Sequence, residues 1–320
     1  MNVFKMNQKA FPGGKPPQAG VAAGGSVTPK RQPKAWSPFT PSGHESLGKI
    51  SRSPGMARRP SDAAIFLVSF LTYLIGIFPS MVYALPTGGT VQAGSATIDS
   101  TSSQLMTIYQ TTDKAIIDWQ AFGIGSTEQV DFQLSQGGVT LNRVTGNDPS
   151  NIFGRLTSNG DLWLINPNGV LFGNSAQVDV HGLIATTSDI SNTNFMSSNY
   201  NFSTPSSLTS TVVNHGSITA AQGGLVALVA PGVQNMGVIT ARLGKVSLAS
   251  GKTFTVDLYG DQLINLGVDS QVMGQVTGGG GQVLTSLVSN SGSIFADGGV
   301  VRLDVNAAQN IVDRVINMDG

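Results

Sequence analysis

The sequence predicts an all-β chain folded as a right-handed parallel β-helix, a solenoid, with an N-terminal cap and small extra-helical β elements. Three observations favour this class. Charged residues make up only 11% of the chain, against about 25% in typical globular proteins, while glycine is abundant at 40 residues. After residue 85, short apolar runs alternate with turn residues and no helical period is sustained. A triplet, Asn-x-Gly, then recurs every 20 to 30 residues.

The triplet recurrence carries most of the fold prediction. A second alternating strand begins about ten residues after the asparagine and is preceded by glycine at Gly224, Gly244 and Gly299. Asparagines that recur at a corner of successive coils can bond one another as a ladder. The long interval from residue 235 to 265 and the glycine run at residues 278–281 predict coils with extruded loops. The triplets start at Asn214, Asn235, Asn265 and Asn290, with a weaker copy at Asn317, and the third departs from the pattern because Asp269 replaces its apolar residue.

Several strands are expected before the repeats. Their apolar and β-branched residues alternate between turn residues, and they span residues 90–98, 105–109, 115–122, 129–134 and 139–144. A stack of parallel coils leaves its first edge unpaired unless something covers it. Residues 85–98 are therefore expected to cap the first coil, together with antiparallel strands that follow them.

The first 84 residues differ from the rest. Residues 1–62 hold ten lysines and arginines against Glu45 and Asp62, and are expected to be a disordered basic extension. Residues 63–84 contain an apolar run of signal-peptide length, and we expect cleavage between Ala84 and Leu85. An uncleaved membrane anchor over the same residues is the alternative. Translation could start at Met1 or at Met56, since Met56 would precede an ordinary basic n-region.

A tight turn stands between two apolar strands at residues 162–172. Pro167 presets φ at the first corner position, and Asn168 or Gly169 accepts the positive φ that a type II turn needs at the second. Taken alone, the segment is a β-turn.

Ordered blocks around this turn resemble the secretion domain of filamentous haemagglutinin-type exoproteins, the exported partners of two-partner secretion systems. The blocks are residues 141–146, 149–154, 159–160, 164–173 and 182–187, and Leu85 to Gly89, Trp119 and Phe122 look similar to the same family. The resemblance covers about residues 85–190. It places the secretion motif on Asn166, Pro167, Asn168 and Gly169, and on Asn142, Arg143 and Gly146 before them. Arg143 could instead serve only to bond carbonyl groups at a coil end.

The resemblance implies export and a set of partners. The chain would cross the inner membrane through the Sec machinery, be recognised by the POTRA domains of a cognate outer-membrane β-barrel, and reach the Gram-negative cell surface or medium. The full protein would act as an adhesin, cytolysin or growth-inhibition toxin on a host or neighbouring cell. Some members carry an upstream Asn-Pro-Asn-Leu motif. Here residues 146–150 read Gly-Asn-Asp-Pro-Ser, so a role tied to that motif is not transferred.

These expectations divide the chain into four parts. The secretion domain core would occupy residues 85–205, and a shaft of repeats residues 206–320, after the extension at 1–62 and the signal segment at 63–84. Because the sequence stops inside a repeat, we expect a fragment of a longer exoprotein.

An enzyme is the rival class, because β-helices also carry polysaccharide lyases and hydrolases with clustered carboxylates. The candidate carboxylates are Asp161, Asp179 and Asp189, and separately Asp257, Asp261 and Asp269. Their Gly, Asn and Ser neighbours favour solvated turn residues. Cysteine is absent, and His44, His181 and His215 are isolated, so neither metal nor cofactor is expected. The acidic body, with scattered cations, argues against nucleic acid as a partner.

Overall fold

The computed structural model describes residues 85–257, 264–266, 271–308 and 311–319. The expected basic extension, the signal segment and Ala84 lie outside the described residues, and Leu85 is the first residue inside them. Among the described residues, no helix has the length and apolar character needed to cross a membrane.

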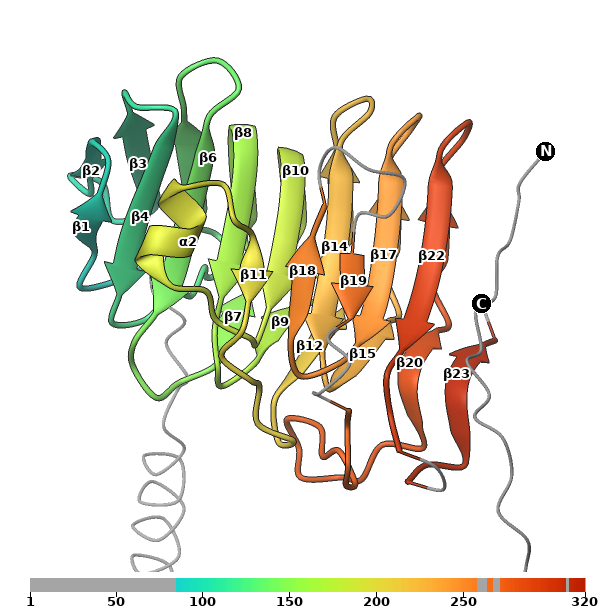
Figure 1. The fold of residues 1–320 in the computed structure, drawn as a ribbon. Helices are drawn as coiled ribbons and strands as arrows, with labels where there is room; N and C mark the ends of the chain where they lie inside the picture. Colours follow the sequence, from blue (N-terminus) through green and yellow to red (C-terminus); the bar gives the residue numbers. More distant parts are fainter. Residues whose placement is uncertain (1–84, 258–263, 267–270, 309–310, 320) are drawn as a thin grey trace, which may run out of the picture. The chain divides into compact units, whose positions relative to one another are not determined.

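The body is a parallel β-helix whose coils each contribute strands to three faces (Figure 1). The first face contains β4 (Lys114–Trp119), β6 (Val139–Val144), the second half of β8 (Arg155–Ile165), the second half of β10 (Gln177–Thr186), β14 (Leu225–Ala230), β17 (Lys245–Ser250) and β22 (Val300–Val305). Each of these strands pairs in parallel with the next one along the stack. The predicted fold class is confirmed.

The other two faces follow the same order. The second face contains β3 (Leu105–Gln110), β5 (Gln129–Gln133), the first halves of β8 and β10, β13 (Ser217–Ala220), β16 (Val238–Thr240) and β21 (Ser293–Phe295). The third face contains β7 (Ser150–Ile152), β9 (Val170–Phe172), β12 (Thr211–Asn214), β15 (Gly232–Asn235), β20 (Ser286–Asn290) and β23 (Arg314–Met318).

The N-terminal cap is a pair of antiparallel strands. β1 (Thr90–Ala93) pairs with β4, and β2 (Ala96–Asp99) pairs with β3. The single strand expected at residues 90–98 is therefore divided at Gly94, whose φ is 76° and where a Cβ would lie 2.1 Å from the Lys114 carbonyl oxygen. β3 and β4 are antiparallel only to these cap strands, because on their other edges they pair in parallel with β5 and β6 and so form the first coil.

The first face is apolar on both sides. Leu162 and Leu164 face the interior of the β-helix, where they belong to one continuous core, whereas Trp163 and Ile165 face outward into a second apolar cluster. A parallel sheet buried on both faces needs a continuous apolar run rather than an alternating one. The run at Leu162–Ile165 has this character.

Two excursions from the β-helix cover that outer cluster. The first excursion, residues 187–210, leaves between β10 and β12 and carries α2 (Asn192–Met196) and β11 (Asn201–Phe202). The second excursion, residues 251–285, leaves between β17 and β20 and carries β18 (Phe254–Val256) and β19 (Ile264–Leu266). Figure 1 shows these elements in front of the first face. The five-residue α2 is the single α-helix in the part of the chain that the structure describes, as the lack of helical period predicted.

The asparagine ladder is confirmed for three of the predicted copies. Asn214 Nδ2 donates to Asn235 Oδ1 at 2.8 Å, and Asn235 Nδ2 donates to Asn290 Oδ1 at 2.6 Å. All three side chains are buried. The Gly that closes each triplet allows close backbone approach: a Cβ on Gly237 or Gly292 would lie 2.1 Å from the carbonyl oxygen of the preceding ladder glycine.

The prediction that all copies of the triplet form coil corners is wrong for two of them, Asn265 and Asn317. Asn265 lies in β19, an extra-helical strand antiparallel to β18, where it stands opposite Thr255. The chain therefore runs from Asn235 to Asn290 before the next ladder position. Asn317 pairs with Ser289 across the third face, and Met318 occupies the place opposite Asn290. An Asn-x-Gly triplet alone does not distinguish a coil corner from a turn outside the coil.

Candidate functional site

The predicted tight turn is present at residues 166–169, but the type II prediction is wrong, because Asn168 at the second central position does not have positive φ. Gly169 N–H donates to the Asn166 carbonyl at 3.0 Å, which closes the turn. Gly169 has a φ of 115°, a value that L side chains rarely adopt, and a Cβ there would lie 3.1 Å from the Thr211 carbonyl oxygen. Both the backbone conformation and the lack of space for a side chain therefore favour glycine at this position.

Asn166 is the centre of the turn's polar contacts. Its side chain is 0% exposed. Its Nδ2 donates to the Asp148 carbonyl and to Ser150 Oγ, each at 3.0 Å. Its Oδ1 accepts from the backbone N–H of Asn168 at 2.9 Å and from that residue's side-chain amide at 3.2 Å. Both donors and the acceptor of the buried amide are therefore satisfied within the chain.

The turn also joins the coils on either side of it. Toward the N-terminus, Asn168 Nδ2 donates to the Gly146 carbonyl at 2.9 Å, and Ser150 N–H donates to the Gly169 carbonyl at 3.0 Å. Toward the C-terminus, the hydroxyl of Ser210 donates to the Pro167 carbonyl. We call residues 146–150 and 166–169 together the motif corner.

Gly146 belongs to this corner for a steric reason. A Cβ on Gly146 would lie 2.1 Å from the carbonyl oxygen of Gln120 in the coil before it. The sequence singled out Gly146 together with the turn, and the structure places them in adjacent coils at the same corner.

Asn142 and Arg143 occupy opposite sides of β6. Asn142 is buried at the same register as the inward-facing residues Ile117 and Leu164. Its Oδ1 accepts from the Trp119 indole N–H at 3.0 Å, and the Trp119 ring meets Phe122 edge-on at 5.6 Å. The interior of the β-helix can hold tryptophan here because its polar N–H has a partner.

Arg143 points outward and holds the first excursion. Its Nε donates to both carboxylate oxygens of Asp189 at 2.9 and 3.0 Å, and its other nitrogens bind Asp118 Oδ1 at 3.1 Å, Asn192 Oδ1 at 2.8 Å and the Ile190 carbonyl at 2.6 Å. A planar guanidinium with several fixed donors suits such a site. The possibility that Arg143 bonds backbone carbonyl groups holds for Ile190 alone among these partners, and the others are the carboxylates of Asp189 and Asp118 and the side-chain amide of Asn192.

Lys114 is a second cationic contact, which sequence reasoning missed. Its Nζ donates to the Phe195 carbonyl at 3.1 Å and to Ser198 Oγ at 2.6 Å, at the C-terminal end of α2. The same ammonium group lies 5.0 Å from the centre of the Tyr200 ring. No local pattern marks Lys114, because its partners lie more than 80 residues away.

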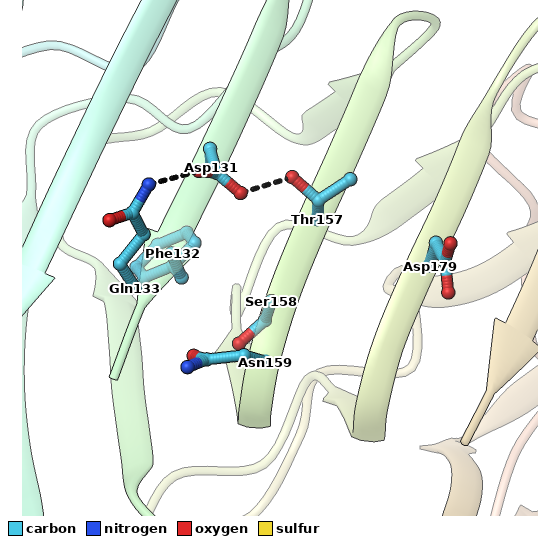
Figure 2. Close-up of a pocket in the computed structure, with 7 residues that line it drawn as sticks. All are labelled: Asp131, Phe132, Gln133, Thr157, Ser158, Asn159 and Asp179. Atoms are coloured by element: carbon cyan, nitrogen blue, oxygen red, sulfur yellow. Dashed lines mark hydrogen bonds between the residues drawn. The ribbon is translucent and has the colours of Figure 1, made fainter. Parts of the chain in front are cut away.

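The second face carries a shallow hollow of about 460 Å³ (Figure 2). Asp131 accepts there from Thr157 Oγ1 at 2.5 Å and from Gln133 Nε2 at 3.0 Å, while Asp179 lies on the next strand of the sheet. The hollow is lined by Asp131, Phe132, Gln133, Thr157, Ser158, Asn159 and Asp179. Gln133, Asn159 and Asp179 are exposed there, whereas Phe132 belongs to the buried core.

Two of the carboxylates considered for an enzyme, Asp161 and Asp189, bind different partners. Asp161 Oδ1 contacts His181 Nδ1 at 2.6 Å, Asp189 binds Arg143, and Asp179 lines the hollow. Asp261 and Asp269 lie outside the described residues. Over the ranges that the structure describes, no group of three or more His, Cys, Asp or Glu could hold a metal ion.

The structure is a parallel β-helix with an N-terminal cap, and the comparisons identify its family. Residues 82–320 match the family described as "TPS secretion domain". The chain belongs to this family, and is the secretion domain of a two-partner secretion exoprotein.

Several known proteins are similar to this chain. The chain is 44% identical over 110 residues to the heme/hemopexin-binding protein of Haemophilus influenzae, which is 34% of this chain and 12% of that protein. It thus spans a small part of that relative's length. The crystal structure of the HMW1 secretion domain from Haemophilus influenzae is similar with a TM-score of 0.57 and 31% identity, over 68% of this chain and 57% of that one. The filamentous hemagglutinin secretion domain aligns over 74% of this chain and 100% of its own, at 14% identity and a TM-score of 0.41.

Proposed function

We propose that this chain leads a longer exoprotein across the outer membrane through a cognate β-barrel transporter. The POTRA domains of that barrel recognise the chain in the periplasm, after the Sec machinery has delivered it and a signal peptidase has cleaved between Ala84 and Leu85. The exported protein then stands at the cell surface or in the medium, where its further regions act as an adhesin, a cytolysin or a growth-inhibition toxin.

The motif corner is the observation that carries this proposal. The motif that the resemblance assigns coincides with a corner where side-chain amides donate to the adjacent coil: Asn166 to the Asp148 carbonyl and Ser150 Oγ, and Asn168 to the Gly146 carbonyl. Such a corner forms only when consecutive coils stack, so it belongs to the folded, exported state. The same groups are free to bind other partners while the chain is unfolded.

The coil-by-coil architecture suits export of an unfolded chain. Each first-face strand contacts mainly its two neighbours in the stack, so folding can begin at one end and propagate. Cysteine is absent, so no disulfide needs to form or be broken before passage. Folding outside the membrane can then oppose backward movement without ATP.

Recognition by strand addition fits the unfolded chain. Its short β-prone segments could each add to an exposed sheet edge of a POTRA domain, where backbone hydrogen bonds supply affinity. In the folded state these segments pair with one another, so release from the transporter and folding become linked.

The decisive experiment compares secretion of the full chain with and without the cognate barrel in the same host. We expect folded protein in the medium only when the barrel is present. Equal amounts in both strains would contradict the proposal. N-terminal sequencing of the secreted product tests the cleavage site, with Leu85 as the expected first residue.

A further inference from the structure

The two excursions meet each other as well as the first face. β11 pairs antiparallel with β18, which places Asn201 opposite Thr255 and Phe202 opposite Phe254. The rings of Phe202 and Phe254 stack with centroids 4.2 Å apart and planes inclined by 10°. Val256 N–H also donates to the Tyr200 carbonyl at 3.0 Å.

A buried hydroxyl network joins the excursions at a second place. Ser188 Oγ donates to the Lys252 carbonyl at 2.8 Å, and Ser206 N–H donates to the same carbonyl at 3.1 Å. Ser206 Oγ in turn binds Ser188 Oγ at 2.8 Å and Thr187 Oγ1 at 2.7 Å. Ser188 is 0% exposed and Ser206 is 4% exposed. Unpaired hydroxyls at this depth would be costly, so the network requires both excursions to be in place.

The joined excursions cover one apolar surface. Trp163 touches Phe195, Tyr200 and Phe202, with ring centroids 5.3, 4.7 and 5.7 Å away. Around it lie outward-facing residues of several coils, all buried: Leu141, Ile165, Ile184, Ala227, Val229 and Ala249. Phe254 belongs to the same cluster, so residues from both excursions are needed to complete the cover.

Neither excursion has enough structure to stand alone. β11 has two residues and β18 has three, and β11 has no strand partner other than β18 among the described residues. Strand pairs this short are unstable in water without packing. Arg143 and Lys114 fix the α2 end of the first excursion, while the Phe202 end depends on Phe254, more than 50 residues later in the chain.

We infer that the two excursions close as one cooperative layer, so that the folding unit of the secretion domain extends through Val256 instead of ending with the first excursion. A chain that has formed its coils only as far as β17 has Ser188, Phe202 and Trp163 without their final cover. Arrival of residues 252–256 completes the layer and locks the earlier coils. This coupling is a property of the folded chain and does not depend on the proposed export route.

Hydrogen–deuterium exchange on the purified full chain tests the coupling. Phe254→Ala is compared with Thr255→Ala, a control on the same strand whose side chain is exposed. We expect Phe254→Ala to raise exchange at least several-fold in peptides covering residues 192–202, with β4 unchanged, while Thr255→Ala leaves both regions protected. The reciprocal variant, Phe202→Ala, should raise exchange in residues 254–256.

A gentler variant covers the case in which Phe254→Ala also loosens the coils. Ser188→Ala removes the side-chain bond to the Lys252 carbonyl and keeps the aromatic stack. We therefore expect faster exchange in both excursions and an unchanged exchange rate in β4. Faster exchange confined to the mutated excursion, in either variant, would overturn the inference. Because secretion is not the readout, failure here is distinguishable from failure of the proposed export function.

Discussion

The motif corner and the asparagine ladder both depend on buried asparagine, but they use it differently. Asn166 binds a carbonyl, a hydroxyl and an amide from different positions of the chain, each contact occurring once. In the ladder, Asn214, Asn235 and Asn290 repeat a single amide-to-amide bond. A repeated bond can be extended by any further coil with asparagine at that place. The corner depends on a particular set of neighbours, and this explains why a distinctive sequence motif marks it.

The largest effect is expected from Asn166→Ala in the motif corner. The substitution leaves the Asp148 carbonyl, the Ser150 hydroxyl and the Asn168 N–H without their buried partner, at a cost of about 2–4 kcal/mol in unfolding free energy. Urea denaturation of the full chain measures it. Asn174→Ala, at an exposed asparagine in a nearby turn, serves as the control and should change the unfolding free energy by less than about 0.5 kcal/mol. Equal effects of the two variants would contradict this view of the corner.

Arg143→Ala should have the next largest effect. The variant leaves Asp189 and Asp118 without their cation at a partly buried place and costs about 1–3 kcal/mol. The loss should be concentrated in the first excursion, where limited proteolysis within residues 187–204 reports it. Arg143→Lys restores the charge without the planar fork and should recover only part of the protection. Arg155→Ala, at an exposed arginine of the second face, should leave proteolysis unchanged.

The ladder should tolerate change better than the corner. Asn235→Ala breaks two amide bonds and costs about 1–2 kcal/mol. Replacing Asn214, Asn235 and Asn290 together by leucine removes all the side-chain amides of the ladder, although the Gly216 N–H and the Gly292 carbonyl lose their partners. The triple variant should therefore recover part of the stability that Asn235→Ala loses. Apolar side chains already occupy the positions next to both ends of the ladder, since Phe172 lies opposite Asn214 and Met318 lies opposite Asn290. Thermal unfolding compares the single and triple variants. A triple variant less stable than Asn235→Ala would contradict this expectation.

The smallest effect concerns pH at the C-terminal end of the first face. Burial raises the pKa of Asp304 above its ordinary value of 3.8. The Arg302 guanidinium, 2.5 Å away, opposes this shift but is the smaller effect. The folded chain therefore holds this proton more tightly than the unfolded chain, and stability falls as pH rises from 3.8 through the raised value. Asp304→Asn should flatten that fall, measured as the change in urea midpoint between acidic and neutral pH. An unchanged slope would show that other groups control it.

The sequence could predict what depends on local pattern. The turn at Pro167 to Gly169, the ladder and the cap all follow from residues within one or two coils. The position of Asn265 could not be predicted, because its triplet resembles the others while the strand it sits in pairs with β18 outside the coil. The partners of Arg143 were equally hidden, since Asp189 lies 46 residues away on an excursion whose path no periodicity reveals.

The outer side of the first face shows the same limit. Its apolar run at residues 162–165 predicted a strand, but only the structure shows that Phe195, Tyr200 and Phe202 cover Trp163. Coverage of a sheet by chain segments far apart in sequence depends on tertiary packing, which local propensity does not contain.

We propose that the motif residues act through the folded corner. The most direct test measures two quantities for Asn166→Ala and Gly169→Val: affinity of the unfolded chain for the isolated POTRA domains of the cognate barrel, and yield of folded protein secreted through that barrel. The account predicts unchanged affinity and a several-fold lower yield for both variants, because only the folded corner needs these residues. Affinity that falls in parallel with yield would contradict it and would show that the transporter reads Asn166 and Gly169 directly.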